Sequence, residues 1–453
     1  MLSIGLMSGT SMDGIDAALI ETDGTPHHLQ TIAGISMDYD PAFKTLLKAA
    51  EYTVRQCQGN WQMAVVRYPE GIRDYLQYGL HISQSDITAH YEVLSTYLKN
   101  SVPHPVMDDI ALSTVVTHST ALHTQLIKQL LQQANVSAQN VQVIGYHGQT
   151  LFHQPDMGIS IAMGDGAALA TDLQITVVND FRREDVAAGG QGAPFAPLYH
   201  QALSIRDNQI PLAVVNCGGI ANITVIPNDN PEDLIAFDTG PGNALLDQLV
   251  KQRTHGEDSF DKDGQYAKQG RIHENVLEAL YQETLIKNGK NYFDQLPPKS
   301  LDYGDLKLIS ALNTLSLPDA CHTLAAFTAD SIVRSLALLP SVADNLPKHW
   351  VLAGGGWKNP VIYQAFKQRL QAKLGSDTTV YHADDIGWST QYMEAEIFAY
   401  LAVRRLNNQP ISFPGTTRVP FPLTGGTIHQ VVPKKESQNM KLLSFYGGLS
   451  KNI

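Results

Sequence analysis

A glycine-bearing turn between two apolar strands occurs twice in this chain. The first copy, residues 5–14, reads Gly-Leu-Met-Ser-Gly-Thr-Ser-Met-Asp-Gly, and the second, residues 215–222, reads Val-Asn-Cys-Gly-Gly-Ile-Ala-Asn. Gly219 in the second copy stands 210 residues after Gly9 in the first. Two such turns in one chain indicate two similar half-domains that face each other across one ligand.

A second pair of segments repeats with nearly the same spacing. Apolar side chains at helical intervals predict helices within residues 108–134 and 319–339, and each is followed by a strand and a glycine turn. Those turns end at Gly148 and Gly356, which are 208 residues apart. Because strands alternate with helices along the chain, we expect a duplicated α/β protein with parallel strand pairs.

The halves are expected to meet at a polar connector that contains a proline, residues 205–212. This places residues 1–208 in an N-terminal lobe and residues 209–453 in a C-terminal lobe. Residues 53–107 have no counterpart in the second half, so we interpret them as an insertion with aromatic-rich helices. We expect the last helix, which starts near Gln391, and the tail after it to pack between the lobes.

Composition excludes several classes of protein. A net charge of -12 argues against nucleic acid as the main partner, because neutralising phosphates requires clustered Lys and Arg. The three cysteines show no Cys-x-x-Cys spacing, which argues against a disulfide framework or a structural zinc site and fits a reducing compartment. The apolar start is interrupted by Ser8 and no apolar run reaches roughly 18 residues, so we expect no signal peptide and no membrane span. The prediction is a cytoplasmic protein.

The first turn, residues 9–14, has the chemistry of a phosphate site. It is neither a Walker A loop nor a Gly-x-Gly-x-x-Gly dinucleotide turn. It does provide consecutive backbone N–H groups, two hydroxyls and a carboxylate, which can surround a phosphate while Asp13 orients a hydrated magnesium ion. The alternative is an ordinary hairpin turn, which Asp-Gly favours.

Two further glycine turns lie in the second half. Residues 237–243 (Phe-Asp-Thr-Gly-Pro-Gly-Asn) run from a strand into a helix, and a helix N-terminus behind a glycine turn attracts anions. Residues 353–360 (Ala-Gly-Gly-Gly-Trp-Lys-Asn-Pro) place three glycines at a strand end, where a flat adenine ring could approach the backbone closely. The alternatives are a capped β-to-α turn and a crowded strand–helix crossing.

In this order, the three turns resemble the ATPase fold shared by sugar kinases, actin and Hsp70 chaperones. The resemblance implies an actin/hexokinase-like fold, with two lobes around a central cleft that binds ATP with Mg2+. Longer motifs, at residues 9–16, 146–150, 180–182, 189–194, 218–222 and 238–243, are similar to those of the 1,6-anhydro-N-acetylmuramic acid kinase family. The residues expected to contact ATP are Gly9, Thr10, Ser11, Met12, Asp13, Gly14, Ile15, Asp16, Gly219, Asn222, Thr239, Gly240, Gly355 and Gly356.

Asp180 is the candidate general base. It follows an apolar strand end, so it would project from a sheet edge into a cleft, where a carboxylate can take a proton from water or a hydroxyl. Such a step contributes roughly 10²–10⁴ in rate. The alternative is a surface ion pair with Arg182. The resemblance implies that Asp180 activates a water that attacks the anomeric carbon of an anhydro-sugar, after which O6 receives the γ-phosphoryl group of ATP.

The expected sugar contacts are His147, Gln149, Thr150, Arg182 and Glu394. A histidine at a strand end is also commonly a hydrogen-bonded structural residue, and Glu396 is the alternative to Glu394 on the same helix. The family resemblance further suggests a homodimer.

The chain departs from the family pattern in one motif. Family members commonly carry Pro-Lys-Ser-Thr-Gly-Arg-Glu after the second phosphate turn, whereas residues 298–304 here read Pro-Lys-Ser-Leu-Asp-Tyr-Gly. Together with the insertion, this leaves another anhydro-sugar such as levoglucosan, or a hexose, as the alternative substrate. A different class, an ATP-driven conformational module without sugar chemistry, is disfavoured because such a module needs neither Asp180 nor His147.

Overall fold

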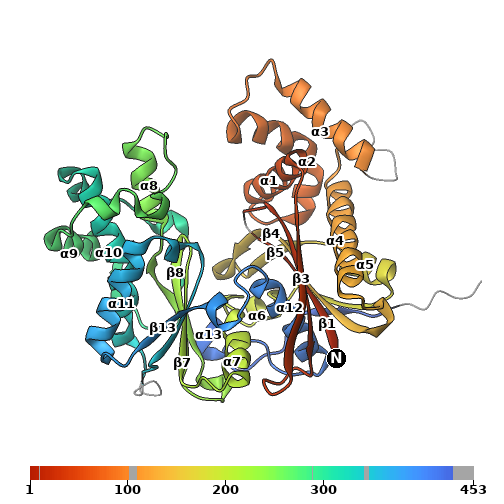
Figure 1. The fold of residues 1–453 in the computed structure, drawn as a ribbon. Helices are drawn as coiled ribbons and strands as arrows, with labels where there is room; N and C mark the ends of the chain where they lie inside the picture. Colours follow the sequence, from red (N-terminus) through yellow and green to blue (C-terminus); the bar gives the residue numbers. More distant parts are fainter. Residues whose placement is uncertain (10, 102–109, 288, 341–345, 432–453) are drawn as a thin grey trace, which may run out of the picture.

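Two large β-sheets with helices packed around them form most of the molecule (Figure 1), and β10 (Ile286–Lys287) and β11 (Lys290–Asn291) form a separate two-stranded sheet. The computed structural model describes the chain except residues 10, 102–109, 288, 341–345 and 432–453. The strands of the first sheet are β1 (Leu2–Ser8), β2 (Gly14–Thr22), β3 (Leu29–Asp38), β4 (Val141–Gln154), β5 (Ile159–Met163), β6 (Thr176–Asn179) and β14 (Thr427–His429). Those of the second sheet are β7 (Leu212–Cys217), β8 (Ile220–Ile226), β9 (Ile235–Pro241), β12 (His349–Ala353) and β13 (Thr379–His382).

Helices lie on both faces of these sheets (Figure 1). They are α1 (Pro41–Gln56), α2 (Trp61–Asp74), α3 (Ile87–Ser101), α4 (Leu112–Ala134), α5 (Gly166–Leu173), α6 (Arg183–Ala187), α7 (Ala196–Arg206), α8 (Ala244–Arg253), α9 (Glu274–Glu283), α10 (Leu317–Ser335), α11 (Pro360–Leu374), α12 (Met393–Leu406) and α13 (Pro414–Thr417). No described helix combines the length and the apolar character that a membrane crossing requires.

The two sheets share one strand order and one set of strand directions. In the first, β3-β2-β1 are antiparallel and β1-β4-β6 are parallel. In the second, β9-β8-β7 are antiparallel and β7-β12-β13 are parallel. The helices predicted from their apolar spacing are α4 and α10, and each precedes the fourth strand of its sheet. The expected duplicated α/β fold is therefore confirmed.

The carboxyl-terminal helix α12 rests directly on the first sheet. Gly5 of β1 and Gly145 of β4 are register partners. A Cβ atom built on Gly5 would overlap the carbonyl of Ala395, and one built on Gly145 would overlap the carbonyl of Phe398. The hydroxyl of Ser3 also donates to the carbonyl of Ala399 at 2.8 Å. Only glycine at these two strand positions allows the helix backbone to approach so closely.

A shared core joins the two sheets. It contains buried residues of both sheets, among them Val143 and Val214, together with Tyr199 of α7 and Phe398 of α12. Helices α7 and α12 accordingly lie between the sheets (Figure 1). The connector at 205–212 falls between the end of α7 and the start of β7. The division of the chain into lobes at this point stays a prediction, and residues 432–453 of the tail lie outside the described residues.

The segment interpreted as an insertion continues helix α1 and forms a helical layer over the first sheet (Figure 1). Helices α1 and α2 cross at Gly71, where a Cβ would overlap the hydroxyl of Thr53. Tyr91 is buried, whereas Tyr78 is 60% exposed. Packing and surface positions thus account for these two tyrosines.

Replacing Gly145 by alanine should destabilise the protein by about 1–3 kcal/mol, because the added methyl group forces α12 away from the sheet. Urea unfolding curves of the wild type and Gly145→Ala measure this difference. Gly304→Ala is the matched control, because a Cβ there would meet no atom within 4 Å. An unchanged unfolding midpoint in Gly145→Ala would contradict the close packing of α12 on β1 and β4.

Candidate active site

The carboxyl ends of β1 and β6 and the middle of β4 bring the predicted groups to one edge of the first sheet. Leu6, Tyr146 and Asn179 form one row across β1, β4 and β6. His147 and Asp180 each follow this row by one residue, and the first turn follows β1. Because neighbouring strands are about 4.8 Å apart, the Asp180 backbone lies roughly 10 Å from the strand that carries this turn.

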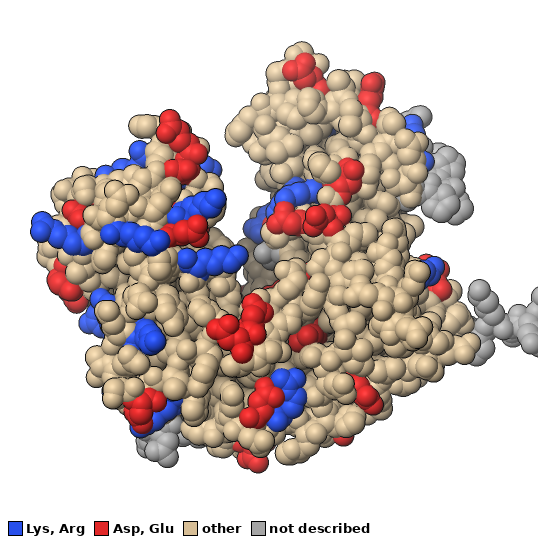
Figure 2. Space-filling view, in the orientation of Figure 1, with Lys and Arg blue, Asp and Glu red and all other residues tan. Residues whose placement is uncertain are grey.

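This edge opens into a hollow between the two halves of the molecule, which Figure 2 shows as a deep groove. A cavity of about 560 Å³ is lined by His153 and Gln191 from the first half and by Asp238, Ser300 and Asp302 from the second half, among others. Residues of both halves can therefore contact one ligand.

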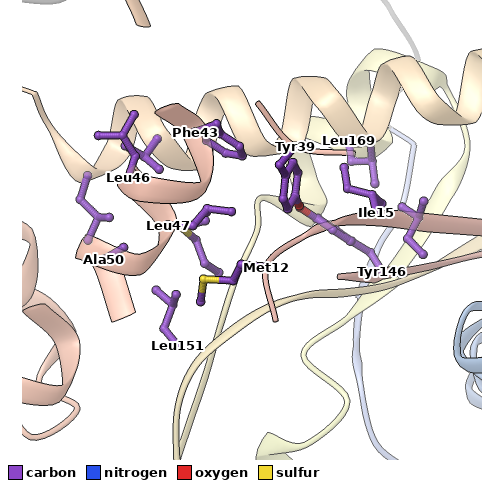
Figure 3. Close-up of a cluster of buried hydrophobic side chains, with 14 of the residues drawn as sticks. Met12, Ile15, Tyr39, Phe43, Leu46, Leu47, Ala50, Tyr146, Leu151 and Leu169 are labelled. Carbon is purple, nitrogen blue, oxygen red and sulfur yellow. The ribbon is translucent and has the colours of Figure 1, made fainter. Parts of the chain in front are cut away.

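The first turn is closed by a hydrogen bond from the Met12 amide to the Gly9 carbonyl at 3.0 Å. Met12 has a left-handed backbone (φ 55°) and its side chain packs near Leu47 and Leu151 in a buried apolar cluster (Figure 3). Ile15 is buried in the same cluster. The side chains of Met12 and Ile15 therefore serve the core, and only their backbone could contact ATP. Thr10 lies outside the described residues.

Asp13 and Asp16 leave the core and point toward neighbouring elements. Asp13 is exposed and pairs with Lys44 of α1, and hydrogen bonds from Lys44 and Ser11 lower the pKa of its carboxyl group. Asp16 accepts hydrogen bonds from Ser36 at 2.5 Å and from Gln391 at 3.1 Å. A magnesium ion held through water by Asp13 would have to compete with Lys44.

The described residues contain no group of three or more His, Cys, Asp or Glu arranged to hold a metal ion. Gly14 contributes no side chain and packs on the neighbouring strand, where a Cβ would overlap the carbonyl of Met37. Asp13 is the residue that we expect to contact the metal ion, and its carboxylate is exposed to solvent.

Gln149 supports the first turn from beneath. It is fully buried, its Nε2 donates to the Gly9 carbonyl at 3.1 Å, and its Oε1 accepts from the Ser8 hydroxyl at 2.6 Å. The Ser8 hydroxyl is also 2.9 Å from that of Tyr39. We expected Gln149 to contact the sugar, but in this structure its amide is used to position the phosphate turn.

The second turn uses its helix N-terminus internally. The amides of Gly242, Asn243 and Ala244 donate to the carbonyls of Gly218 and Gly219 at 2.8–3.0 Å. Asn243 and Ala244 carry two of the N–H groups at the start of α8 where we expect an anion. The start of α8 thus holds the β7–β8 hairpin in place, and these two amides are not available to phosphate in this structure.

Three residues that we expect to contact ATP, Asn222, Thr239 and Gly240, lie on strands β8 and β9. The Thr239 hydroxyl donates to the Ala221 carbonyl at 3.1 Å, and a Cβ on Gly240 would lie 2.9 Å from the Ser331 hydroxyl. Asn222 pairs with Asp238 between β8 and β9. Because side chains alternate along a strand, Asp238 faces the cleft while Thr239 faces α10.

The third turn lies against the second. A Cβ on Gly356 would overlap the Cys217 sulfur and would lie 2.9 Å from the Asn243 amide nitrogen, whereas one on Gly355 would meet nothing within 4 Å. Gly355 lines a hollow of about 520 Å³ with Lys358 and Gln391, among others. Since Gln391 also bonds Asp16, this hollow adjoins the first sheet. The open Gly355 backbone fits a flat ring better than the packed Gly356 does.

Asp180 occupies the edge of the cleft with an unusual backbone. Its φ is 56°, a left-handed conformation that is uncommon outside glycine and that often marks functional sites. Its side chain is 29% exposed and pairs with Arg183 at 2.9 Å. Burial raises the pKa of the Asp180 carboxyl, and Arg183 opposes that rise. The partner is therefore Arg183 and not the Arg182 that the sequence suggested.

His147 and Arg182 form one unit beside Asp180. The buried His147 uses Nδ1 to donate to the Gly148 carbonyl at 2.7 Å, so Nε2 accepts from Arg182 at 3.0 Å. Burial and the neighbouring Arg182 lower the pKa of His147 to about 3, so the ring is neutral. Arg182 also donates to the Gly192 carbonyl at 2.6 Å. His147 therefore positions Arg182 and the glycine loop at 189–192.

Thr150 lies farther along β4, half-buried and paired with Ala162. Of the five residues expected at the sugar, Arg182 and Glu394 present ionisable groups beside the cleft. His147 and Gln149 are buried behind these groups.

Glu394 and Glu396 point in different directions. Glu396 is 5% exposed and accepts a hydrogen bond from the Tyr199 hydroxyl at 3.0 Å in the core between the sheets. Glu394 is accessible to solvent at the start of α12, yet protein surrounds its carboxylate on most sides, so desolvation raises its pKa while Arg182 opposes the rise. Glu394 is thus exposed and attracted to Arg182, whereas Glu396 is buried in the core.

Asp238 is a cleft residue that we did not assign a role. It accepts a hydrogen bond from the Leu301 amide at 2.8 Å, and burial raises its pKa to about 6. A perturbed carboxyl group that lines a cleft is a candidate for function. The available signal was its position at the start of the Asp-Thr-Gly run that ends β9.

Glu396 should make stability depend on pH. Burial raises its pKa from 4.5 to about 7, so its stabilising contribution is complete below pH 4.5 and is lost as pH rises through about 7. Glu396→Gln imitates the protonated form. Its unfolding free energy relative to the wild type should therefore increase between these two pH values, as urea unfolding at pH 5 and pH 8 would measure. A difference that does not change with pH would contradict this placement.

Comparison with known proteins identifies the family of this chain. The family model described as anhydro-N-acetylmuramic acid kinase matches residues 94–430. The anhydro-N-acetylmuramic acid kinase of Zymomonas mobilis is 39% identical over 95% of this chain and 100% of its own length. That of Rhizorhabdus wittichii is 40% identical over 95% of this chain and 99% of its own.

Among solved structures, a ROK family glucokinase from Streptomyces griseus in complex with glucose and AMPPNP overlays with a TM-score of 0.35 at 12% identity, covering 89% of this chain and 99% of its own. The extent of the family-model match and the identity to its members over nearly the whole chain decide the assignment. The chain belongs to the anhydro-N-acetylmuramic acid kinase family.

Proposed function

We propose that this protein is an ATP-dependent kinase that opens the 1,6-anhydro bridge of anhydro-N-acetylmuramic acid with water and phosphorylates O6. The product is N-acetylmuramic acid 6-phosphate, an intermediate of peptidoglycan recycling. The observation that carries the proposal is the half-buried Asp180 carboxylate at the cleft edge, beside the His147–Arg182 unit, in a chain of this family.

Asp180 has the environment that a general base needs. Burial raises its pKa and strengthens it as a proton acceptor, while Arg183 keeps the carboxylate ionised. In the proposed reaction Asp180 takes a proton from water and the water oxygen bonds to the anomeric carbon. The bond between that carbon and O6 breaks, O6 attacks the γ-phosphorus, and ADP leaves. The proton on Asp180 is then released to solvent.

Arg182 and Glu394 are the proposed sugar contacts. Arg182 is held by His147 and Gly192, so its cation is oriented before substrate arrives. A fixed guanidinium suits the carboxylate of the lactyl group, which distinguishes a muramic acid derivative from anhydro-glucose. Glu394, attracted to Arg182, can accept hydrogen bonds from sugar hydroxyls.

The nucleotide is proposed to lie between the first turn and the hollow at Gly355. The backbone at Gly9 and the exposed Ser11 would face phosphates, and the open backbone at Gly355 would face adenine. Asp13 would hold Mg2+ through water once Lys44 releases it, and Lys44 then becomes a cation available to phosphate. A homodimer in the cytoplasm remains our prediction for its assembly and location.

Asp180→Asn should lower the sugar-dependent release of ADP by roughly 10²–10⁴ while leaving nucleotide binding unchanged, because the amide cannot accept the proton. Coupled detection of ADP with anhydro-N-acetylmuramic acid, levoglucosan, N-acetylmuramic acid and glucose measures the rate and the preference. Mass detection of oxygen from labelled water in the product tests the hydrolytic step.

Asp172→Asn is the matched control, because Asp172 is exposed on α5, away from the cleft edge. It should retain wild-type activity. Near-normal turnover in Asp180→Asn would remove Asp180 from the proposed mechanism, and a faster reaction with glucose or levoglucosan would overturn the substrate.

Arg183→Gln should shift the pH profile. Arg183 lowers the pKa of Asp180, so its removal raises that pKa and leaves the base protonated at higher pH. The acid limb of kcat/KM against pH should therefore move to higher pH. Arg55→Gln, which replaces a similarly exposed arginine paired on α1, should leave the limb in place. A shift to lower pH in Arg183→Gln would contradict the role of the pair.

A further inference from the structure

The loop that departs from the family pattern covers the β7–β8 hairpin, which carries the expected ATP contact Gly219. Tyr303 in this loop is 65% exposed, yet its hydroxyl lies on Gly219. A Cβ atom built on Gly219 would overlap the hydroxyl oxygen and the ring carbon that bears it. Burial raises the pKa of the Tyr303 hydroxyl, and the adjacent Gly219 backbone opposes that rise. The space that glycine leaves open at this turn is thus filled by a side chain of the same protein.

The loop that carries Tyr303 is anchored just before this residue. The Leu301 amide donates to Asp238 at 2.8 Å, and the Lys299 ammonium donates to the Tyr292 carbonyl at 3.0 Å. Tyr303 itself begins a short 3-10 turn closed by reciprocal bonds between Asp302 and Asp305. The position of Tyr303 therefore follows from local contacts of the loop, although the ring is exposed.

A phenol hydroxyl and a phosphate oxygen would use the same feature of Gly219. Both accept a hydrogen bond from a backbone N–H, and both need the close approach that only glycine permits. The neighbouring first amides of α8 are already bonded to the carbonyls of Gly218 and Gly219. The Gly219 backbone is consequently the part of this turn over which the two oxygens would compete.

We propose that Tyr303 occupies the Gly219 position of the β7–β8 hairpin when nucleotide is absent and that nucleotide binding displaces it. The inference rests on the nucleotide site of the proposed function and adds a regulatory step to it. Displacing Tyr303 moves the loop 298–306, which also contacts Gln191 of the first half through Ser300 at 3.4 Å. Nucleotide binding is thereby linked to the glycine loop that Arg182 holds.

The displacement has a measurable consequence for affinity. When the binding-competent state is only a fraction of the population, the apparent Kd is the intrinsic Kd divided by that fraction. Removing the occupant should therefore tighten binding. For a contact the size of one hydrogen bond and part of a ring, the expected gain is about 5- to 10-fold.

Titration calorimetry of the full chain with a non-hydrolysable ATP analogue and Mg2+ tests the proposal. Tyr303→Ala should bind about 5- to 10-fold more tightly than the wild type, and Tyr303→Phe, which keeps the ring but loses the hydroxyl, should lie between them. Tyr78→Ala, which removes a tyrosine of similar exposure from the helical layer of the first half, should bind as the wild type does.

Two results would overturn the proposal. Equal affinity in Tyr303→Ala and the wild type would show that the ring is not in the way of nucleotide. Weaker binding in Tyr303→Ala would make Tyr303 a direct contact of the bound nucleotide. Amide hydrogen exchange of the wild type, with and without nucleotide, provides a second test. Nucleotide should increase exchange in residues 299–306. Decreased exchange there would also contradict displacement of Tyr303.

The calorimetric experiment separates this inference from the proposed function, because it needs no sugar. Tighter binding in Tyr303→Ala together with no turnover of anhydro-N-acetylmuramic acid would support the inference and overturn the proposed function. Turnover of that sugar with equal nucleotide affinity in all variants would support the proposed function and overturn the inference.

Discussion

The contact between α12 and the two glycines of the first sheet organises much of the site. With a side chain at Gly5 or Gly145, the helix could not lie on β1 and β4, and its first turn would not reach the cleft edge. In this position of the helix, Glu394 is attracted to Arg182, while Glu396 is buried and accepts a hydrogen bond from Tyr199. The remaining apolar surface of the helix helps to join the two sheets. One close approach of backbone to backbone therefore sets both the cleft and the core between the halves.

A second constraint is that polar groups at the expected ligand sites form hydrogen bonds and ion pairs with other residues of the protein. The amides at the start of α8 bond to the Gly218 and Gly219 carbonyls, Lys44 pairs with Asp13, and Tyr303 lies on Gly219. Buried N–H groups need partners in the absence of ligand, and charges are stabilised by opposite charges nearby. The affinity for a ligand then depends on the internal hydrogen bonds and ion pairs that it must break as well as on the contacts that it forms.

Much of the fold could be predicted because it repeats. The spacing between Gly9 and Gly219 led to two sheets with the same strand order, and the apolar spacing of α4 and α10 located the two equivalent helices. Asp180 could be placed at a strand end because an apolar strand, now β6, directly precedes it. Side-chain direction was less accessible. We expected ligand contacts from Met12 and Gln149, yet both side chains are buried. The left-handed turn directs Met12 into the core, and Gln149, on β4, bonds to Ser8 and Gly9.

The sequence by itself determined the order of strands and glycine turns and the chemical groups available at them, since these depend on neighbouring residues and short periodicities. Only the tertiary structure decided which groups meet. Glu394 and Glu396 are separated by roughly 200° around a helix, and the seat of α12 selects which one faces the cleft. Tyr303 and Gly219 lie far apart in sequence yet are in contact. Asp180 pairs with Arg183 and not with Arg182, which the sequence suggested. Such contacts depend on packing summed over the whole chain, which no local pattern records.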